Sequence, residues 1–97
     1  MFSSGPAPAA SLRVTVLYFA ALRDLAGVGE EQVELPTPGT AAELSVGALL
    51  LALSERHAAL QGRLASVRVA VNEEFTEPTT LLRGGEVVAL IPPVSGG

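Results

Sequence analysis

The chain has 97 residues, 48% of them hydrophobic, with a formal net charge of −4, no cysteine and one histidine, and all six of its cationic side chains are arginines. These numbers exclude disulfides, a thiol nucleophile, a Schiff-base lysine and any ordinary metal site, so we do not expect catalysis by the chain's own side chains. The length predicts one domain, and an acidic chain without a basic cluster is unsuited to nucleic acid or anionic membranes and favours a basic protein as partner.

The N-terminal segment, residues 1–11, is small, uncharged and rich in proline and alanine. Such a segment cannot bury enough apolar surface to order itself, so we expect a disordered leader. It has neither the basic and apolar pattern of a secretory signal nor the arginine-rich pattern of an organellar one. No stretch of the chain approaches the roughly 18 apolar residues of a membrane span. The sequence therefore predicts a soluble, cytosolic protein.

The first strand is expected at residues 12–19, which are rich in β-branched and aromatic side chains. Alternation places Leu17 and Phe19 on the face opposite Val14 and Val16. Both faces of this strand are therefore apolar.

A short helical turn is expected at residues 20–26, because helix formers there are followed by Gly27. Arg23 lies in this turn, either solvated or close to the C-terminal tail. Residues 31–35 alternate and stop at Pro36, which predicts a strand at the edge of a sheet.

The main helix is expected after a loop over residues 36–43. Ser45 fits an N-cap. A second possible start lies one turn earlier, where Thr40 and Glu43 form a T-x-x-E capping box, and the sequence leaves both starts open. The apolar positions that follow have the helical spacing i, i+3, i+4, i+7: Val46, Leu49, Leu50, Leu53 and His57. We interpret His57 as a helix C-terminal residue favoured by the helix dipole, and not as a catalyst.

The C-terminal half alternates cleanly over residues 67–72, which predicts a strand. Residues 72–78 are expected to form a turn, residues 80–82 a short extended or helical piece, and residues 83–86 another turn. The last strand is expected at residues 87–91.

Two strands, a long helix and further strands predict an α+β fold, a roll in which one main helix covers one face of a mixed sheet. If the first and last strands are parallel neighbours, the helix provides the crossover that this connection requires. This is the element order of ubiquitin-like, or β-grasp, domains. The expected organisation is a leader over residues 1–11, a β-grasp domain over residues 12–91 and a flexible tail over residues 92–97.

An apolar patch is expected on the face of the sheet without the helix. Leu17, Phe19 and Ile91 would meet there on the two adjacent strands, and we interpret them as a docking surface rather than as core. Acidic side chains elsewhere are interpreted as solvated, with at most a steering role toward a basic partner: Glu30, Glu31, Glu73, Glu74 and Glu77.

The chain ends in a diglycine. Pro92 and Pro93 deny the sheet two donors, so the last strand must stop there and release the tail. Two glycines without Cβ atoms can enter a slot too narrow for other residues. The reactive atom would then be the terminal carbonyl carbon of Gly97, with the preceding tail residues binding the partner: Pro92, Pro93, Val94, Ser95 and Gly96.

Four segments together resemble the small, sulfur-carrying subunits of molybdopterin synthase, a family within the ubiquitin-like β-grasp superfamily. They are VLYFAALRDLAG at 16–27, VAVNEEF at 69–75, GGEV at 84–87 and IPPVSGG at 91–97. The resemblance covers residues 12–97, and departs from the family at residues 38–44 and in the leader.

The resemblance implies a function for the tail. In this family a ubiquitin-activating-like enzyme uses ATP to adenylate the terminal glycine, here Gly97, and sulfur then replaces AMP to give a thiocarboxylate. The large synthase subunit uses this sulfur to build the molybdopterin dithiolene on cyclic pyranopterin monophosphate. The small subunit would be non-catalytic, would hold no permanent cofactor and no metal, and would form a heterotetramer of two small and two large subunits.

Two alternatives remain open. One is a sulfur carrier for another product, such as the thiazole of thiamine, a modified tRNA base or cysteine. The other is a protein modifier that forms isopeptide bonds with lysines of target proteins. The absence of lysine prevents only lysine-linked chains of this protein itself.

Overall fold

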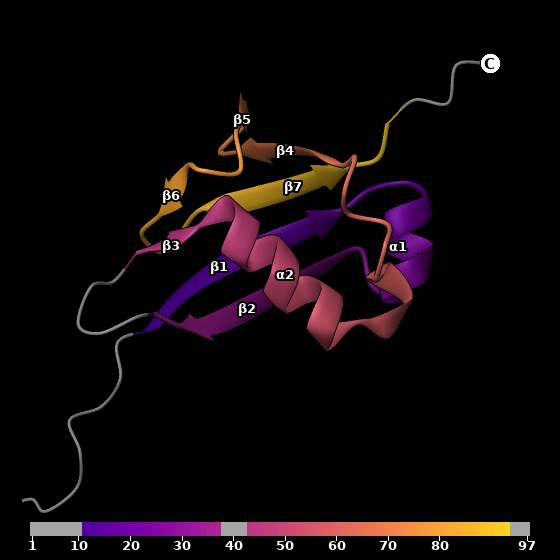
Figure 1. Ribbon diagram of the computed structural model, residues 1–97, viewed down its shortest axis with the longest axis horizontal. Coiled ribbons are helices and arrows are strands. Elements are labelled where there is room, and N and C mark those ends of the chain that lie inside the picture. The colour runs from indigo at the N-terminus through magenta and orange to yellow at the C-terminus, as the bar shows by residue number, and fades with distance from the viewer. Residues whose placement is uncertain (1–10, 38–42, 94–97) are drawn as a thin grey trace, which may run out of the picture.

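The computed structural model describes residues 11–37 and 43–93. Five strands form the main sheet, in the order β2-β1-β7-β4-β5. Their bounds are β1 Ser11–Tyr18, β2 Glu30–Pro36, β4 Arg68–Val71, β5 Glu74–Thr76 and β7 Val87–Ile91. A single main helix, α2 (Val46–Arg56), crosses one face of this sheet (Figure 1). The predicted α+β roll is confirmed.

The two central strands, β1 and β7, are parallel, and the other pairs in the main sheet are antiparallel. Both central strands end on the side of the molecule where α1 (Ala21–Ala26) lies (Figure 1). The chain passes through α2 between the early hairpin and the last strand, as a parallel connection requires. The end of β7, where the tail begins, is therefore next to the end of β1.

The core lies between the sheet and α2. Alternate residues of β1 face it, and leucines one turn apart on α2 meet them from the other side. Burial of these side chains is the main stabilising contribution, since a fully buried Val or Leu contributes about 1.5–3 kcal/mol. The fully buried large side chains are Leu49, Leu53, Leu60, Leu82, Leu90, Val14, Val16, Val33, Val46 and Val88.

The start of α2 is fixed by Ser45, whose Oγ accepts a hydrogen bond from the backbone N–H of Ala48 at 3.1 Å. This confirms the predicted N-cap. The earlier start through Thr40 and Glu43 is wrong, because Leu44 and Ser45 are extended and form β3 (Leu44–Ser45), which pairs with β6 (Leu81–Leu82). Pairing with a distant segment overrides the local capping signal here.

The short helix α1 ends as predicted at Gly27, which is left-handed with φ 81° and donates its N–H to the Arg23 carbonyl at 2.9 Å. After α2, η1 (Ala58–Leu60) is a single 3₁₀ turn that packs on α1. This contact closes the end of the core near the end of β1.

Several element boundaries differ from the sequence prediction by one residue, as at the end of β1, which is Tyr18 and not Phe19. Two differences change the interpretation. Ser11, the last residue of the predicted leader, belongs to β1 and pairs with Pro36, while the rest of the leader lies outside the described residues. The segment 72–78 is not only a turn, because β5 forms within it and pairs with β4. A strand of three residues is too short to show an alternating pattern in sequence.

Within residues 11–37 and 43–93, we find no helix with the length and apolar character to cross a membrane.

Candidate protein-docking site

A row of side chains crosses all five strands on the face of the main sheet that α2 leaves uncovered. Cα pairing aligns Glu30 with Leu17, Leu17 with Ala89, Ala89 with Ala70, and Ala70 with Phe75. Residues paired directly across strands share a face of a sheet. The small alanines of β7 and β4 therefore form a floor between two larger side chains, Leu17 and Phe75.

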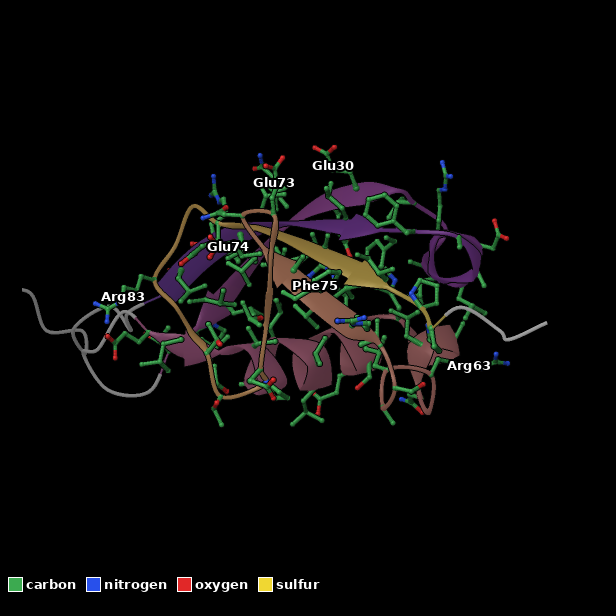
Figure 2. The ribbon with its side chains drawn as sticks, turned by 90° about the horizontal axis from the view of Figure 1, so that it is seen from above. Glu30, Arg63, Glu73, Glu74, Phe75 and Arg83 are labelled. Carbon is green, nitrogen blue, oxygen red and sulfur yellow. The ribbon has the colours of Figure 1, made fainter. Side chains whose placement is uncertain are left out.

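This floor belongs to an open apolar depression of about 600 Å³. The acidic residues Glu73 and Glu30 lie on the side of the sheet away from α2 (Figure 2). The depression is lined by Leu17, Phe19, Ala70, Asn72, Glu73, Phe75, Val87, Ala89 and Ile91.

The structure brings together the three predicted docking residues, Leu17, Phe19 and Ile91, in this depression. Phe19 is 44% exposed, and it is not part of the buried core on the other face. Clustered large apolar side chains at the surface are typical of protein interaction sites. The assignment of strand faces is thus confirmed, while the docking role stays a prediction.

The chain turns sharply directly after Phe19. The backbone N–H of Phe19 donates to the Leu90 carbonyl at 3.3 Å, which ties the end of β1 to β7. Ala20 then adopts a positive φ of 51°, a strained conformation for a residue with a Cβ. These two features hold the Phe19 side chain beside Ile91, where the last strand ends.

Arg23 lies exposed on α1, next to this turn. The aliphatic part of its side chain covers Gly29, at which an added Cβ would be only 3.1 Å from Arg23 Cδ. The structure thus gives Arg23 a packing contact, and its predicted role toward the partner is not tested by it.

Sequence reasoning missed Phe75, which is 60% exposed and forms a wall of the depression. The guanidinium carbon of Arg68 lies 4.2 Å from the centroid of the Phe75 ring, a cation–π contact. The missed signal was Asn72, a residue that favours left-handed turns, followed by a short run with an aromatic residue at its centre.

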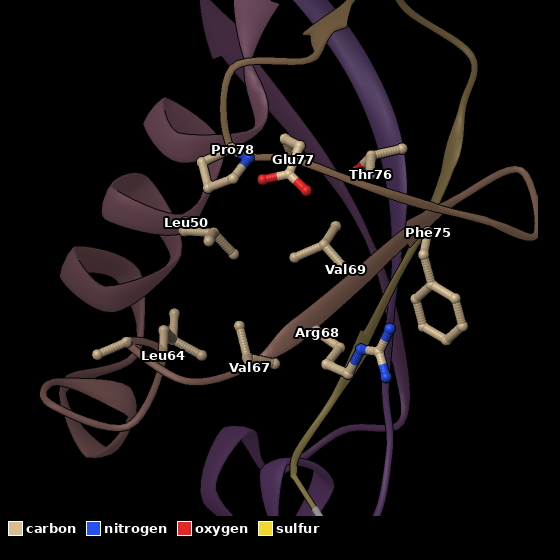
Figure 3. A pocket seen from close by; sticks show the side chains of 10 residues that line it. Leu50, Leu64, Val67, Arg68, Val69, Phe75, Thr76, Glu77 and Pro78 are labelled. Atoms are coloured by element: carbon tan, nitrogen blue, oxygen red, sulfur yellow. The ribbon is translucent and has the colours of Figure 1, made fainter.

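Phe75 and Arg68 also line a second, smaller hollow of about 290 Å³, between α2 and the strands β4 and β5 (Figure 3). Leu50 and Leu64 close it on the helix side. Phe75 therefore lies between the helix layer and the apolar depression, and we call the residues that line this depression the docking face.

A polar cluster at the opposite sheet edge was also missed. One oxygen of Glu31, Oε2, accepts hydrogen bonds from Tyr18 Oη at 2.6 Å and from His57 Nε2 at 2.7 Å. Arg56 Nε lies 3.4 Å from the other oxygen. The Glu31 side chain is only 15% exposed, so its interpretation as a solvated acid is wrong. His57 does end α2 as predicted, but its ring also bonds to β2.

This environment shifts two pKa values. Burial by itself would raise the pKa of the Glu31 carboxyl, but the hydrogen bonds from Tyr18 and His57, with the charge of Arg56, outweigh it and hold that pKa below its ordinary value. Burial first, and then the hydrogen bond to Glu31, raise the pKa of the Tyr18 phenol well above its ordinary value. The cluster is therefore a neutral phenol and an ionised carboxylate at neutral pH.

The last strand ends at Ile91, as predicted. Pro92 is half-buried and Pro93 is exposed, so the chain leaves the sheet beside the docking face. The other predicted tail residues lie outside the described part of the chain: Val94, Ser95, Gly96 and Gly97.

Comparison with known proteins assigns the chain to a family. The model of the ThiS family matches residues 16–97. The chain belongs to this family. The match includes the end of β1, the residues that line the depression and the diglycine end.

Curated relatives of this ThiS-family chain include the molybdopterin synthase sulfur carrier subunit of Chlamydomonas reinhardtii, which is 38% identical over 88 residues, covering 89% of this chain and 100% of the relative. The resemblance stated from the sequence is confirmed.

Among solved structures, a putative molybdopterin converting factor subunit 1 from Pyrococcus furiosus has a TM-score of 0.74 and 34% identity, covering 86% of this chain and 99% of that one. Small archaeal modifier protein 1 of H. volcanii has a TM-score of 0.74 and 26% identity, with 86% and 99% covered.

Proposed function

We propose that this ThiS-family chain is the sulfur carrier subunit of a molybdopterin synthase. The observation that carries the proposal is the position of the apolar docking face, which adjoins the point where β7 ends and the diglycine tail begins. A partner that covers this face would receive the tail at its edge. Relatives that align over nearly the whole chain bear the same subunit name.

The reacting group in this proposal is the carboxylate of Gly97. A free carboxylate is ionised at neutral pH and is a poor electrophile, whereas its mixed anhydride with AMP has a good leaving group. A sulfur nucleophile then displaces AMP and leaves a thiocarboxylate on Gly97. The chain has no cysteine, so its own side chains offer no other thiol to carry sulfur.

Two protein partners follow from this chemistry. An adenylating enzyme would use ATP to adenylate Gly97, with release of pyrophosphate, and sulfur would then replace AMP. The large synthase subunit would transfer that sulfur to cyclic pyranopterin monophosphate, in a heterotetramer of two small and two large subunits. The chain would be non-catalytic, with Gly97 as the reacting terminus. Leu17, Phe19 and Ile91 would contact the partner, with Arg23 beside them and Pro92 to Gly96 in its channel. The cytosolic location inferred from the sequence stays a prediction.

The intact mass of the protein purified from its own cells tests the proposal. Replacement of one terminal oxygen by sulfur raises the mass by about 16 Da, and fragmentation should place the increase on Gly97. Deletion of the adenylating enzyme should abolish the heavier species. If the heavier species is absent while the cells make molybdopterin, the sulfur-carrier proposal is wrong.

A second candidate function is protein modification, because small archaeal modifier protein 1 has the same fold at 26% identity. In that case Gly97 would form isopeptide bonds with lysines of other proteins. Arg83 is the last trypsin site of this chain, so tryptic digests of the cell would then contain lysines that carry residues 84–97. The first candidate predicts the thiocarboxylate and no such branched peptides.

A further inference from the structure

The turn between β4 and β5 is strained. Asn72 and Glu73 form its centre, and both have positive φ, 50° and 72°. A two-residue hairpin of this kind favours Asn followed by Gly, because only glycine adopts the second position without a steric cost. Asn72 fits its position, since asparagine tolerates left-handed backbone. Glu73 stands where glycine would relieve the strain.

The turn is also fixed in place. Asn72 donates its backbone N–H to the Val87 carbonyl at 2.9 Å and accepts the Val87 N–H on its side-chain Oδ1 at 3.0 Å. This pair of hydrogen bonds holds the turn against the start of β7. Glu73 therefore stays at one end of the apolar depression, the end opposite Ile91.

Some charged side chains around the depression have a partner in the part of the chain that the structure describes, and others do not. Arg68 is held over the Phe75 ring at one side, and the exposed Glu30 follows Leu17 at the other. Further along β1, Arg13 pairs with Glu34 at 3.5 Å. Among the residues described, no ion pair or hydrogen bond involves the Glu73 carboxylate. Glu73 thus places an unpaired negative charge beside apolar surface, which favours a partner with a cation opposite it.

We propose that Glu73 is a specificity-determining residue of the docking face, and that the large subunit presents a lysine or arginine to it when it covers the depression. The inference rests on the proposed function, because it takes the large subunit as the occupant. The left-handed backbone at Glu73 costs folding free energy that a glycine at the same position would not cost. The fold alone therefore does not require glutamate here, whereas a charge pair with the partner would account for it.

Affinity and association rate for the large subunit of the same organism, measured at several ionic strengths, test the proposal. Glu73→Gln keeps the shape and removes the charge, so binding should weaken about threefold, mainly through slower association, with a flatter dependence on salt. Glu73→Lys reverses the charge and should weaken binding tenfold or more. Glu55→Gln makes the same charge change on α2, on the opposite layer, and should leave binding within about twofold.

The variant Glu73→Gly distinguishes an effect on binding from an effect on the stability of the fold. Relief of the left-handed strain should leave the unfolding temperature of the free chain equal or raise it by a few degrees, roughly 2–4 °C, while binding weakens as in Glu73→Gln. Higher stability together with weaker binding is a result that damage to the fold cannot give.

Phe19→Ala distinguishes failure of this inference from failure of the proposed function. If Phe19→Ala weakens binding while Glu73→Gln and Glu73→Lys do not, the Glu73 proposal is overturned and the docking face stands. If none of these variants affects binding, or the unaltered chain does not bind, the assignment of this face to the large subunit falls as well. Equal losses in Glu73→Gln and Glu55→Gln would show a general charge effect and also overturn the proposal.

Discussion

Glu31 joins three separate parts of the chain through a single carboxylate. It lies on β2, accepts from Tyr18 at the end of β1 and from His57 at the end of α2, and the Tyr18 and His57 rings meet edge to face with centroids 5.9 Å apart. A hydrogen bond to a charged group contributes about 1.5–3 kcal/mol. The cluster therefore fixes the C-terminal end of α2 on the edge of the sheet.

Replacement of Glu31 by alanine should lower the free energy of unfolding at neutral pH by about 2–3 kcal/mol, because the Tyr18 hydroxyl and His57 lose a buried charged acceptor. Denaturant titration measures this. The neighbouring Glu30 is exposed, and Glu30→Ala should stay within about 0.5 kcal/mol.

The Glu31 carboxylate should also make part of the free energy of unfolding sensitive to acid. The pKa of Glu31 is lower in the folded than in the unfolded chain, so its contribution is present above the unfolded value of about 4.3 and is lost as pH falls through the folded value. Stability measured from neutral pH downward should therefore fall less steeply in Glu31→Ala. An unchanged acid slope would show that other carboxylates dominate acid unfolding.

At the scale of elements, the two faces of β1 have different surroundings. Val14, Val16 and Tyr18 are buried against α2, whereas Leu17 and Phe19 face the depression. Because side chains alternate with a period of two, one strand can supply both the core and a docking surface.

Phe19→Ala should weaken binding to the large subunit at least tenfold, because truncation of a central aromatic anchor typically costs more than about 2 kcal/mol. The free chain should keep its thermal stability, since Phe19 is already 44% exposed. Val16→Ala is the matched contrast: it removes fully buried methyl groups, and should destabilise the fold while leaving the affinity of the folded chain unchanged. A large loss of stability in Phe19→Ala without loss of affinity would assign Phe19 to the core.

Local patterns predicted the elements that depend on local chemistry. Alternation in β1 and β7 gave their faces, Ser45 gave the start of α2, and Gly27 gave the end of α1. The Glu31 cluster could not be found in this way, because its partners are 13 and 26 residues distant in sequence and only the folded chain brings them together.

The docking face was predicted in part for the same reason. Leu17 and Ile91 lie on β1 and β7, and Phe19 directly follows β1, so the alternation of these segments assigns a face to each. Phe75 lies on a three-residue strand whose face is set by pairing with Ala70. The left-handed backbone of Glu73 likewise depends on this hairpin and on its bonds to β7, and a glutamate carries no turn signal of its own.

Over the whole molecule, the core and the reactive end occupy different parts of the chain. The buried hydrophobic cluster consists of residues between Leu12 and Leu90, and the strand that leads to the tail ends at Ile91. The tail residue proposed to react is Gly97, six positions later. Stability and sulfur transfer should therefore respond independently to mutation.

Removal of Gly97 should abolish sulfur transfer and leave the unfolding midpoint unchanged. The shortened chain still ends in a glycine carboxylate, but this carboxylate lies up to about 3.6 Å short of the reacting position, and misplacement by about 1 Å can already reduce a rate by two orders of magnitude. The measurements are thermal unfolding of the free chain and single-turnover transfer in a reconstituted synthase. Gly96→Val keeps the length and adds a β-branched side chain, so it should also block transfer if the tail enters a narrow channel. Full activity of the shortened chain would place the sulfur elsewhere than on Gly97, whereas loss of activity in both variants with an unchanged midpoint assigns the reaction to the terminus and the stability to the domain.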